Sequence, residues 1–210
     1  MIAVIDLGIS NIYSVVRAFE HVGADIVVTN KSQDVLDANK IVLPGVGSFE
    51  SGMKNIYKYD LFETIGECAD KNKPILGICL GMQLLMDSSE EGGRTSGLGL
   101  IPGDVRYIHK KETFNSSVKI PNIGWYGLKL GRNIDTWDDT ILNNVEENSD
   151  CYFVHSLCVS VENQSHELAS STYGGVEFAS VVRNNNIVGC QFHPENSGHV
   201  GLNIIDNFVK

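Results

Sequence analysis

One cysteine in the chain is placed as a nucleophile would be. Cys79 lies in Gly77-Ile78-Cys79-Leu80-Gly81, at the end of the predicted strand Pro74 to Cys79 and before a helix-like segment. A residue at such a sharp turn is held out at the carboxyl edge of the sheet, and flanking glycines relieve the crowding. The amino end of the following helix favours a thiolate. The pattern predicts a cysteine nucleophile; the alternative is a small buried cysteine in a tight turn.

A histidine and a glutamate near the end of the chain could complete this chemistry. Glu195 follows His193 by two positions, with Pro194 between them. Proline biases the preceding residue toward an extended conformation, in which positions two apart point the same way. Glu195 can then hold the His193 imidazole in one tautomer, while His193 keeps Cys79 ionised and later acts as general acid. A lone His-Pro-Glu would be a surface turn, but together with the glycine-flanked cysteine it predicts a catalytic triad.

A glycine-rich loop offers a third part of the same site. Pro44-Gly45-Val46-Gly47-Ser48 closes the third predicted strand, Lys40 to Leu43. Two glycines leave backbone N–H groups accessible and allow a peptide to turn over. Together with the N–H of Leu80, such donors could hold the oxyanion of a tetrahedral intermediate. Alone, the loop would be an ordinary turn.

The elements that must position these residues alternate between strand and helix. Strands are predicted at Ile2 to Asp6, Asp25 to Thr29, Lys40 to Leu43, Pro74 to Cys79, Cys151 to His155, Phe178 to Arg183 and Ile187 to Phe192. Apolar residues at helical spacing separate the first four, and Ser10 or Asn11 is placed to cap the first helix. The asparagines before Ile187 predict a hairpin turn. The pattern between Gly92 and Asp150 is weak.

This alternation predicts an α/β fold with an open, mostly parallel sheet covered by helices on both faces, plus antiparallel strands in the C-terminal half. A last helix turns Val200, Ile204, Ile205 and Phe208 inward. We find no linker that would divide the 210 residues. A single domain over residues 1–210 is therefore expected.

Composition excludes several other classes. The formal net charge of -10 argues against nucleic-acid binding, and no apolar run is long enough for a membrane span. The amino terminus is typical of a buried first strand rather than a signal peptide. Five cysteines without a Cys-x-x-Cys pair, and scattered histidines, predict no disulfide framework, no metal site and a cytoplasmic setting. We expect burial of the cysteines other than Cys79, namely Cys68, Cys151, Cys158 and Cys190.

Taken together, the three motifs resemble those of the class I, or triad, glutamine amidotransferases. In detail the chain is similar to the family of glutaminase subunits of imidazole glycerol phosphate synthase, in histidine biosynthesis. The resemblance runs nearly end to end. It is carried by Asp6 to Gly8 with Asn11, Leu43 to Phe49, Pro74 to Leu85, Ser89 to Gly92, Gly97 to Gly99, Gly124-Trp125, Tyr152 to Ser156, Tyr173-Gly174 and Gly189 to Glu195.

The resemblance implies a chemistry and a set of residue roles. Cys79, His193 and Glu195 would hydrolyse glutamine to glutamate and ammonia, without a cofactor. The glutamine and its oxyanion would be held by Gly45, Val46, Gly47, Leu80, Gln83, His155, Ser156 and Leu157. Of these, His155 is polar within an otherwise apolar strand, which a plain core strand explains less well.

The resemblance also implies a partner. A (β/α)8-barrel cyclase subunit would dock over the active site to form a heterodimer, receive the ammonia, and make imidazole glycerol phosphate and AICAR. The rim facing it would include Asn11, Trp125, Tyr152 and Asn196. Because the loop Gly45 to Gly47 can flip, we expect the oxyanion site to be incomplete until the partner binds.

The chain departs from the family pattern at four places, none of them in the triad. Ser10 replaces a glycine, Asn122-Ile123-Gly124-Trp125-Tyr126 replaces His-Met-Gly-Trp-Asn, Leu157 replaces a tyrosine, and Asn196 replaces a lysine. Loss of the cation at 196 removes a possible ion pair with the partner and puts the usual partner in question.

Three alternatives to this function stay open. A sister group with the same motifs supplies ammonia to enzymes that amidinate sugars for surface polysaccharides. A catalytically silent regulatory relative is opposed by the intact triad. A hydrolase or chaperone of the related superfamily would keep the elbow cysteine but lack the His-Pro-Glu present here.

Overall fold

The computed structural model describes all residues from Met1 to Lys210. Its strands are β1 Ile2–Ile5, β2 Ile26–Thr29, β3 Lys40–Gly45, β4 Ile75–Cys79, β5 Met86–Ser89, β6 Thr95–Ser96, β7 Ile101–Tyr107, β8 Asn122–Gly127, β9 Lys129–Leu130, β10 Asp150–His155, β11 Leu157–Val161, β12 Glu167–Tyr173, β13 Val176–Asn184 and β14 Ile187–Cys190. Its α-helices are α1 Ile12–His21, α2 Ser32–Asp37, α3 Phe49–Lys58, α4 Leu61–Asp70, α5 Leu80–Leu84 and α6 Gly198–Val209. Three short 3-10 helices are η1 Ile108–Lys110, η2 Gln164–His166 and η3 Pro194–Asn196.

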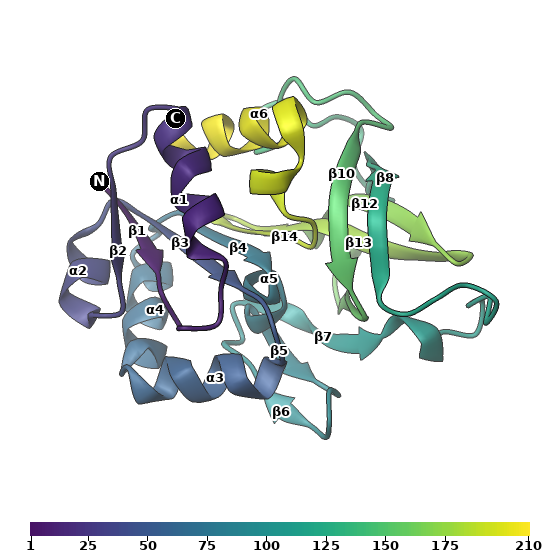
Figure 1. Cartoon of the computed structure of the whole chain (residues 1–210), viewed down its shortest axis with the longest axis horizontal. Coiled ribbons are helices and arrows are strands. Elements are labelled where there is room, and N and C mark those ends of the chain that lie inside the picture. Colours follow the sequence, from purple (N-terminus) through teal and green to yellow (C-terminus); the bar gives the residue numbers. More distant parts are fainter.

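An eight-stranded sheet in the order β2-β1-β3-β4-β14-β13-β12-β9 forms the frame of the molecule. The first five of these strands run parallel, and β13, β12 and β9 continue the sheet with antiparallel pairing. β8 and β10 pair as an antiparallel ribbon beside it, and β11, β7, β5 and β6 form a third sheet (Figure 1). The predicted fold class is confirmed.

Helices cover both faces of the parallel part, as expected (Figure 1). On one face Val4 and Val42 meet α1 and α6 through residues such as Phe19. On the other face Ile5 and Leu43 join the side chains that α2, α3 and α4 contribute. Because successive residues of a strand point to opposite faces, a strand buried on both faces is apolar throughout. That is why β1, β3 and β4, whose residues are almost all buried, stood out in the sequence.

The third strand continues further than predicted. It was expected to stop before Pro44, but β3 runs through Pro44 to Gly45 and stays in register with β4 as far as Cys79. Pairing of β3 with β1 ends at Val42, so β3 has a free side beyond that point. Proline weakens a strand least where one side needs no hydrogen bond. The extension brings the glycine-rich loop level with the nucleophile.

One other local prediction needs correction. Asn11 occupies the position before α1 but makes no capping bond to the backbone; its side-chain amide donates to the Ser14 hydroxyl, at 3.0 Å, instead. The helix after Cys79 is only five residues long, because the chain turns into β5 at Met86. The hairpin between β13 and β14 is confirmed, and Asn185 takes the positive φ of 54° that such turns favour.

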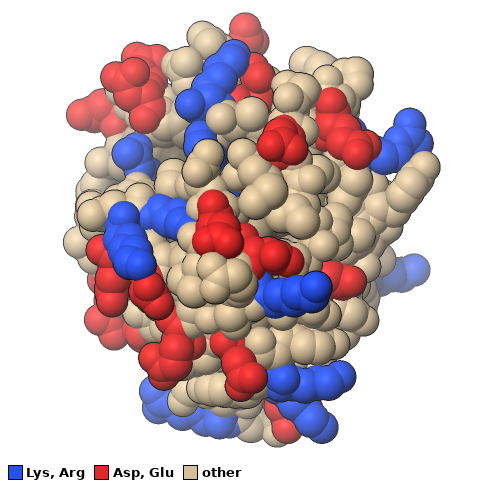
Figure 2. All heavy atoms as spheres, turned by 90° about the vertical axis from the view of Figure 1, so that its left-hand side faces the viewer, with Lys and Arg blue, Asp and Glu red and all other residues tan.

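The surface and the buried thiols agree with the sequence. On the face that carries β2 and α2, acidic and basic side chains are interspersed (Figure 2). No helix is both long enough and apolar enough to cross a lipid bilayer. Cys68, Cys151, Cys158 and Cys190 are all buried and free, as predicted. Burial raises the pKa of Cys151 to about 12 and that of Cys158 to about 11, so neither thiol ionises readily.

Candidate active site

The turn that carries Cys79 is strained and tightly enclosed. Cys79 has φ 54° and ψ -107°, directly before α5. Such a backbone is unfavourable for a residue with a Cβ and persists only where its surroundings impose it. A Cβ added to Gly81 would lie 1.7 Å from the Leu43 carbonyl oxygen, and one added to Gly77 would lie 2.7 Å from the backbone of Gly81. Both glycines are therefore required for the turn to close.

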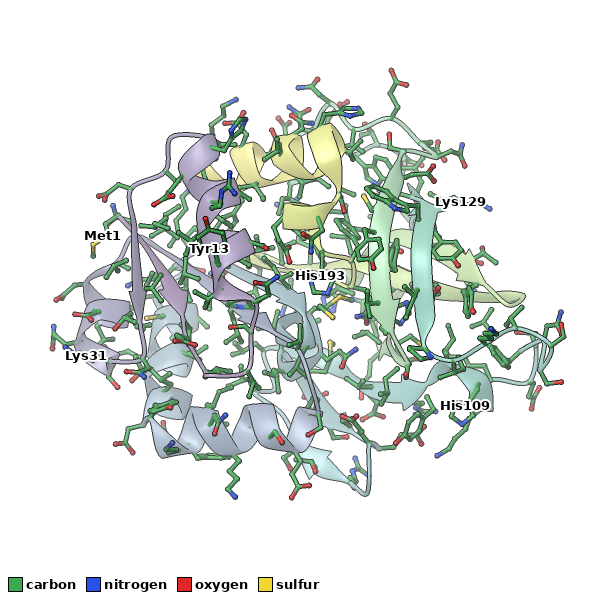
Figure 3. The ribbon with its side chains drawn as sticks, viewed as in Figure 1. Met1, Tyr13, Lys31, His109, Lys129 and His193 are labelled. Carbon is green, nitrogen blue, oxygen red and sulfur yellow. The ribbon has the colours of Figure 1, made fainter.

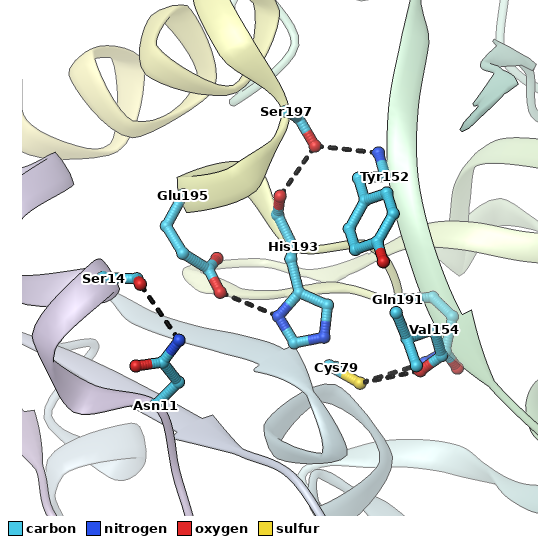
Figure 4. Close-up of polar contacts among 9 residues, drawn as sticks. All are labelled: Asn11, Ser14, Cys79, Tyr152, Val154, Gln191, His193, Glu195 and Ser197. Atoms are coloured by element: carbon cyan, nitrogen blue, oxygen red, sulfur yellow. Dashed lines mark hydrogen bonds and ion pairs between the residues drawn. The ribbon is translucent and has the colours of Figure 1, made fainter. Parts of the chain in front are cut away.

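His193 and Glu195 form the expected pair. The His193 Nδ1 atom lies 2.8 Å from a carboxylate oxygen of Glu195, and their side chains are only 10% and 3% exposed (Figure 4). The contact does not arise from an extended segment as predicted. Only His193 is extended, with φ -99° and ψ 96°, while Glu195 lies in η3 and folds back toward the ring. Proline at the first position of η3 starts that turn.

The backbone of His193 is anchored to the neighbouring ribbon. Its N–H donates to the Tyr152 carbonyl at 2.9 Å. The Ser197 hydroxyl donates to the His193 carbonyl at 2.7 Å and accepts from the Tyr152 N–H at 3.0 Å (Figure 4). Ser197 is a supporting residue that the sequence did not single out. It fixes the imidazole between the main sheet and β10, near the centre of the molecule (Figure 3).

The structure brings Cys79 and His193 together. Burial on its own would lower the pKa of His193, but hydrogen bonds to Cys79 and Glu195, with the charges of both, outweigh it and raise the pKa to about 10. A raised histidine pKa means that the protonated ring is favoured beside these two groups. The arrangement is that of a nucleophile, its proton carrier and the carboxylate that orients the carrier.

A cavity of about 220 Å³ opens in front of the sulfur. Most of the predicted site residues line it: Val46, Gly47, Cys79, Leu80, Gln83, His155, Ser156, Leu157 and His193. Gly45 lies beneath it, close to Leu80, and Glu195 lies behind the His193 ring. Glu91, Pro121 and Val154 also line the cavity, although no role was predicted for them from the sequence. Glu91 lay inside a segment that carries the family resemblance, but nothing in its spacing marked the carboxylate.

The far wall of the cavity is held by His155. Its Nδ1–H donates to the Leu157 carbonyl at 2.7 Å, and its Nε2 accepts from the side-chain amide of Asn122 at 2.9 Å. Burial lowers the pKa of His155 to about 4, so the ring is neutral and this tautomer follows from its two partners. Asn122, one of the departures from the family pattern, thus sits directly across the β8–β10 ladder from His155.

The glycine-rich loop Gly45 to Gly47 does not present its Val46 N–H to the cavity. The Val46 N–H donates to the Ile9 carbonyl at 2.8 Å, so it points away from an incoming substrate. Gly47 has φ +100°, and a Cβ added there would meet no atom within 4 Å. Val46 is 42% exposed. The loop therefore has the room and the glycine that a peptide reversal requires.

The predicted rim residues are exposed or half-buried and lie in β8, in β10, in η3 and just before α1. Trp125 of β8 is 52% exposed and packs against Tyr152 of β10, with ring centroids 5.7 Å apart. Asn11 precedes α1 and Asn196 ends η3, and both are exposed. α1 packs against η3, so these two asparagines lie in adjoining elements. The structure offers no cluster of three or more His, Cys, Asp or Glu side chains that could hold a metal ion.

Comparison with known proteins agrees with this geometry. The family described as "Glutamine amidotransferase class-I" matches residues 3–210. The chain belongs to the class-I glutamine amidotransferases. It is therefore an enzyme that hydrolyses glutamine, and the alternative of a different hydrolase or a chaperone from the wider superfamily is excluded.

Relatives extend over the full length of this amidotransferase. It is 41% identical to imidazole glycerol phosphate synthase subunit HisH 1 of Legionella pneumophila (strain Lens), covering 100% of the chain and 98% of the relative. The HisH subunit of Methanosarcina barkeri is 42% identical, covering 99% and 97%. Among solved structures, PurLQS from Thermotoga maritima has a TM-score of 0.69 at 22% identity, covering 99% and 96%, and shows the shared fold. The relatives are named as subunits, which implies a partner subunit.

Proposed function

We propose that this chain is the glutaminase subunit of an imidazole glycerol phosphate synthase, one amidotransferase domain over residues 1–210 that acts in the cytoplasm. Glutamine hydrolysis rests on the triad geometry, in which Cys79, His193 and Glu195 meet at one cavity. The pathway rests on relatives of 40% identity or more from bacteria and archaea that bear this name.

The reaction follows from the positions of the three groups. The Cys79 thiolate attacks the carboxamide carbon of glutamine, and the charge that develops on oxygen requires N–H donors such as those of Leu80 and the loop. The protonated His193 ring gives its proton to the departing nitrogen, and ammonia leaves. Water, deprotonated by His193, then hydrolyses the thioester to glutamate and restores the thiol. Glu195 keeps Nδ1 protonated throughout and so directs Nε2 toward the sulfur.

The ends of the substrate would be recognised by different walls of the cavity. Glu91 offers a carboxylate to the α-ammonium of glutamine, and its own position is fixed by the Phe49 N–H at 2.6 Å. Gly47, Gln83 and the backbone of Ser156 and Leu157 lie close enough to the cavity to hold the remaining polar atoms. No cofactor is needed, because each step is a proton transfer or an acyl transfer.

The partner would be a (β/α)8-barrel cyclase that forms a heterodimer with this chain. Trp125 and Tyr152 offer an aromatic surface beside the cavity, with Asn11 and Asn196 on adjoining elements. A closed interface has a chemical reason: ammonia released into neutral water becomes ammonium and ceases to be a nucleophile. Docking over the cavity would keep it unprotonated on its way to the acceptor.

The test is glutamate release with and without a (β/α)8-barrel cyclase subunit, and with Cys79→Ser as a control. We expect hydrolysis in the complex, and a loss of at least about a thousandfold in Cys79→Ser. Robust turnover that survives this substitution would reject the triad. Stimulation by a sugar amidotransferase instead of a cyclase would assign the chain to polysaccharide synthesis, and no hydrolysis with either partner would leave a silent relative.

A further inference from the structure

A buried glutamine, Gln191, lies within hydrogen-bonding distance of the Cys79 sulfur. Gln191 follows β14 directly, is 0% exposed, and its backbone N–H donates to the Ser180 carbonyl at 2.8 Å. Its side-chain Nε2 donates to the Cys79 sulfur at 3.9 Å (Figure 4). A fully buried amide costs stability unless its polar atoms are partnered. Here one of the partners is the reacting atom.

The orientation of this amide is set by a second glutamine. Gln83 of α5 donates from its Nε2 to the Gln191 Oε1 atom at 3.1 Å. Because Oε1 is occupied as an acceptor, the N–H groups of Gln191 must face the other way, toward Cys79. Gln83 also reaches the Leu157 carbonyl at 3.5 Å, which His155 holds from the other side at 2.7 Å. The nucleophile is thereby connected to the wall that would hold the substrate.

The contacts on the sulfur show why a donor is needed there. The Cys79 thiol also lies 3.7 Å from the Val154 carbonyl oxygen, to which it can donate while protonated. Once the proton leaves, the negative sulfur faces that partly negative oxygen, and the contact becomes unfavourable. The N–H of Gln191 points its positive end at the same atom and opposes this effect. Hydrogen bonds to an ionised group are the stronger kind.

We propose that Gln191 is a positioning residue for the nucleophile: it holds the Cys79 sulfur in the attacking position and stabilises its ionised form against the Val154 carbonyl. This inference rests on the proposed function, because a held thiolate matters only if Cys79 attacks a substrate. The competing explanation is purely structural, in which Gln191 only ties β14 to α5 through Gln83. The two differ in whether the ionisation of Cys79 changes when the amide is removed.

Alkylation of Cys79 by iodoacetamide as a function of pH distinguishes them, because the thiolate is the reacting form. The titratable groups around the sulfur are His193, with Glu195 behind it, and His155 and Glu91 at the cavity. All four stay in place in every variant compared. The experiment uses the chain alone, without partner or glutamine. Intact-mass spectrometry measures the extent of alkylation, and peptide mapping assigns it to Cys79.

We expect Gln191→Met to raise the midpoint of the alkylation profile by about half to one pH unit, the effect of losing one hydrogen bond to an anion. In the complex, kcat for glutamine should fall about tenfold while KM changes little. Gln191→Leu also removes the N–H donor without adding a charge, so its midpoint should rise as well. It carries the test if the methionine variant does not fold.

The matched control is Cys190→Ala, a fully buried neighbour at the end of the same strand, which should leave the midpoint unchanged. Midpoints of both Gln191 variants within about 0.2 pH unit of the unaltered chain would overturn the proposal. Failure of the proposed function would look different. The unaltered chain would then release no glutamate with any partner, while the shift between variants in the alkylation profile would stand.

Discussion

Two backbone segments border the cavity at Cys79, and they differ in how much space surrounds them. The turn around Cys79 is enclosed, with glycines at 77 and 81 that leave no room for a Cβ. The loop Gly45 to Gly47 ends in exposed residues, has free space around Gly47, and uses its Val46 N–H on the Ile9 carbonyl. Packing therefore restricts the Cys79 turn to one conformation, whereas the loop Gly45 to Gly47 has space for a peptide to turn over.

This difference in packing separates the placement of Cys79 and His193 from the placement of an N–H donor for the oxyanion. The nucleophile and its base are assembled by packing alone, so their geometry exists in the free chain. The Val46 N–H, which we propose as a donor for the oxyanion, is bound to the Ile9 carbonyl instead, in an exposed loop. An enzyme that must not release ammonia without an acceptor gains from this division, because reversal of one peptide could switch hydrolysis on.

A single substitution can disrupt the tightly packed turn around Cys79. Gly81→Ala places a methyl group where the Leu43 carbonyl lies, so we expect a loss of more than about 4 kcal/mol in the free energy of unfolding and little folded protein. Gly66→Ala is the matched control, because Gly66 lies inside α4 with nothing near its Cβ position. That change should stabilise the chain by about 0.5 to 1 kcal/mol. Urea denaturation measures both, and a native-like stability of Gly81→Ala would refute the steric argument.

The open loop Gly45 to Gly47 predicts that the rate of glutamine hydrolysis depends on the partner. If the Val46 N–H becomes available only in the complex, the free chain lacks one oxyanion donor and should hydrolyse glutamine about 100 to 1,000 times more slowly. Glutamate release at saturating glutamine, with and without the cyclase, measures the ratio. Equal rates would show that the loop already provides its donor, and the contrast between the two segments would lose its functional meaning.

We expect the stability of the fold to depend on pH through the buried side chain of His155 at the cavity wall. Burial lowers the pKa of His155 to about 4, whereas the unfolded chain binds a proton near 6.5. The stabilisation is therefore complete above about pH 6.5 and is lost as the pH falls toward 4, by an amount of a few kcal/mol. His155→Gln should show a smaller fall in melting temperature between pH 7 and 4.5 than the unaltered chain. The same substitution at the exposed His199 should not change that fall.

The smallest effect is expected at the rim. Asn196→Lys adds a cation at an exposed position, where an ion pair with an acidic partner residue contributes about 0.2 to 1 kcal/mol. Affinity for the cyclase should rise about two- to fivefold at low salt and return toward the original value at high salt. Gln164→Lys, at an exposed position in η2, controls for the added charge. If both changes act alike, residue 196 does not face an acid on the partner.

Sequence reasoning succeeded where a residue type has one physical explanation. Strands buried on both faces must be apolar, and a cysteine between glycines at a strand end has few uses, so β1, β3, β4 and the Cys79 turn were predictable. It failed where a function depends on contacts made across the chain. Gln191 stood next to the predicted triad, yet only its packing against Gln83 and Cys79 reveals what its amide touches.

By itself the sequence determined the fold class and predicted the cysteine, histidine and glutamate that the structure brings together, because these depend on local backbone constraints and on the period of apolar residues. Only the tertiary structure decided that Glu91, Asn122 and Gln191 join the site and that the Val46 N–H is engaged with Ile9. A hydrogen bond requires a particular distance and angle between its two groups. For residues far apart in the chain, the order of the amino acids does not give either quantity.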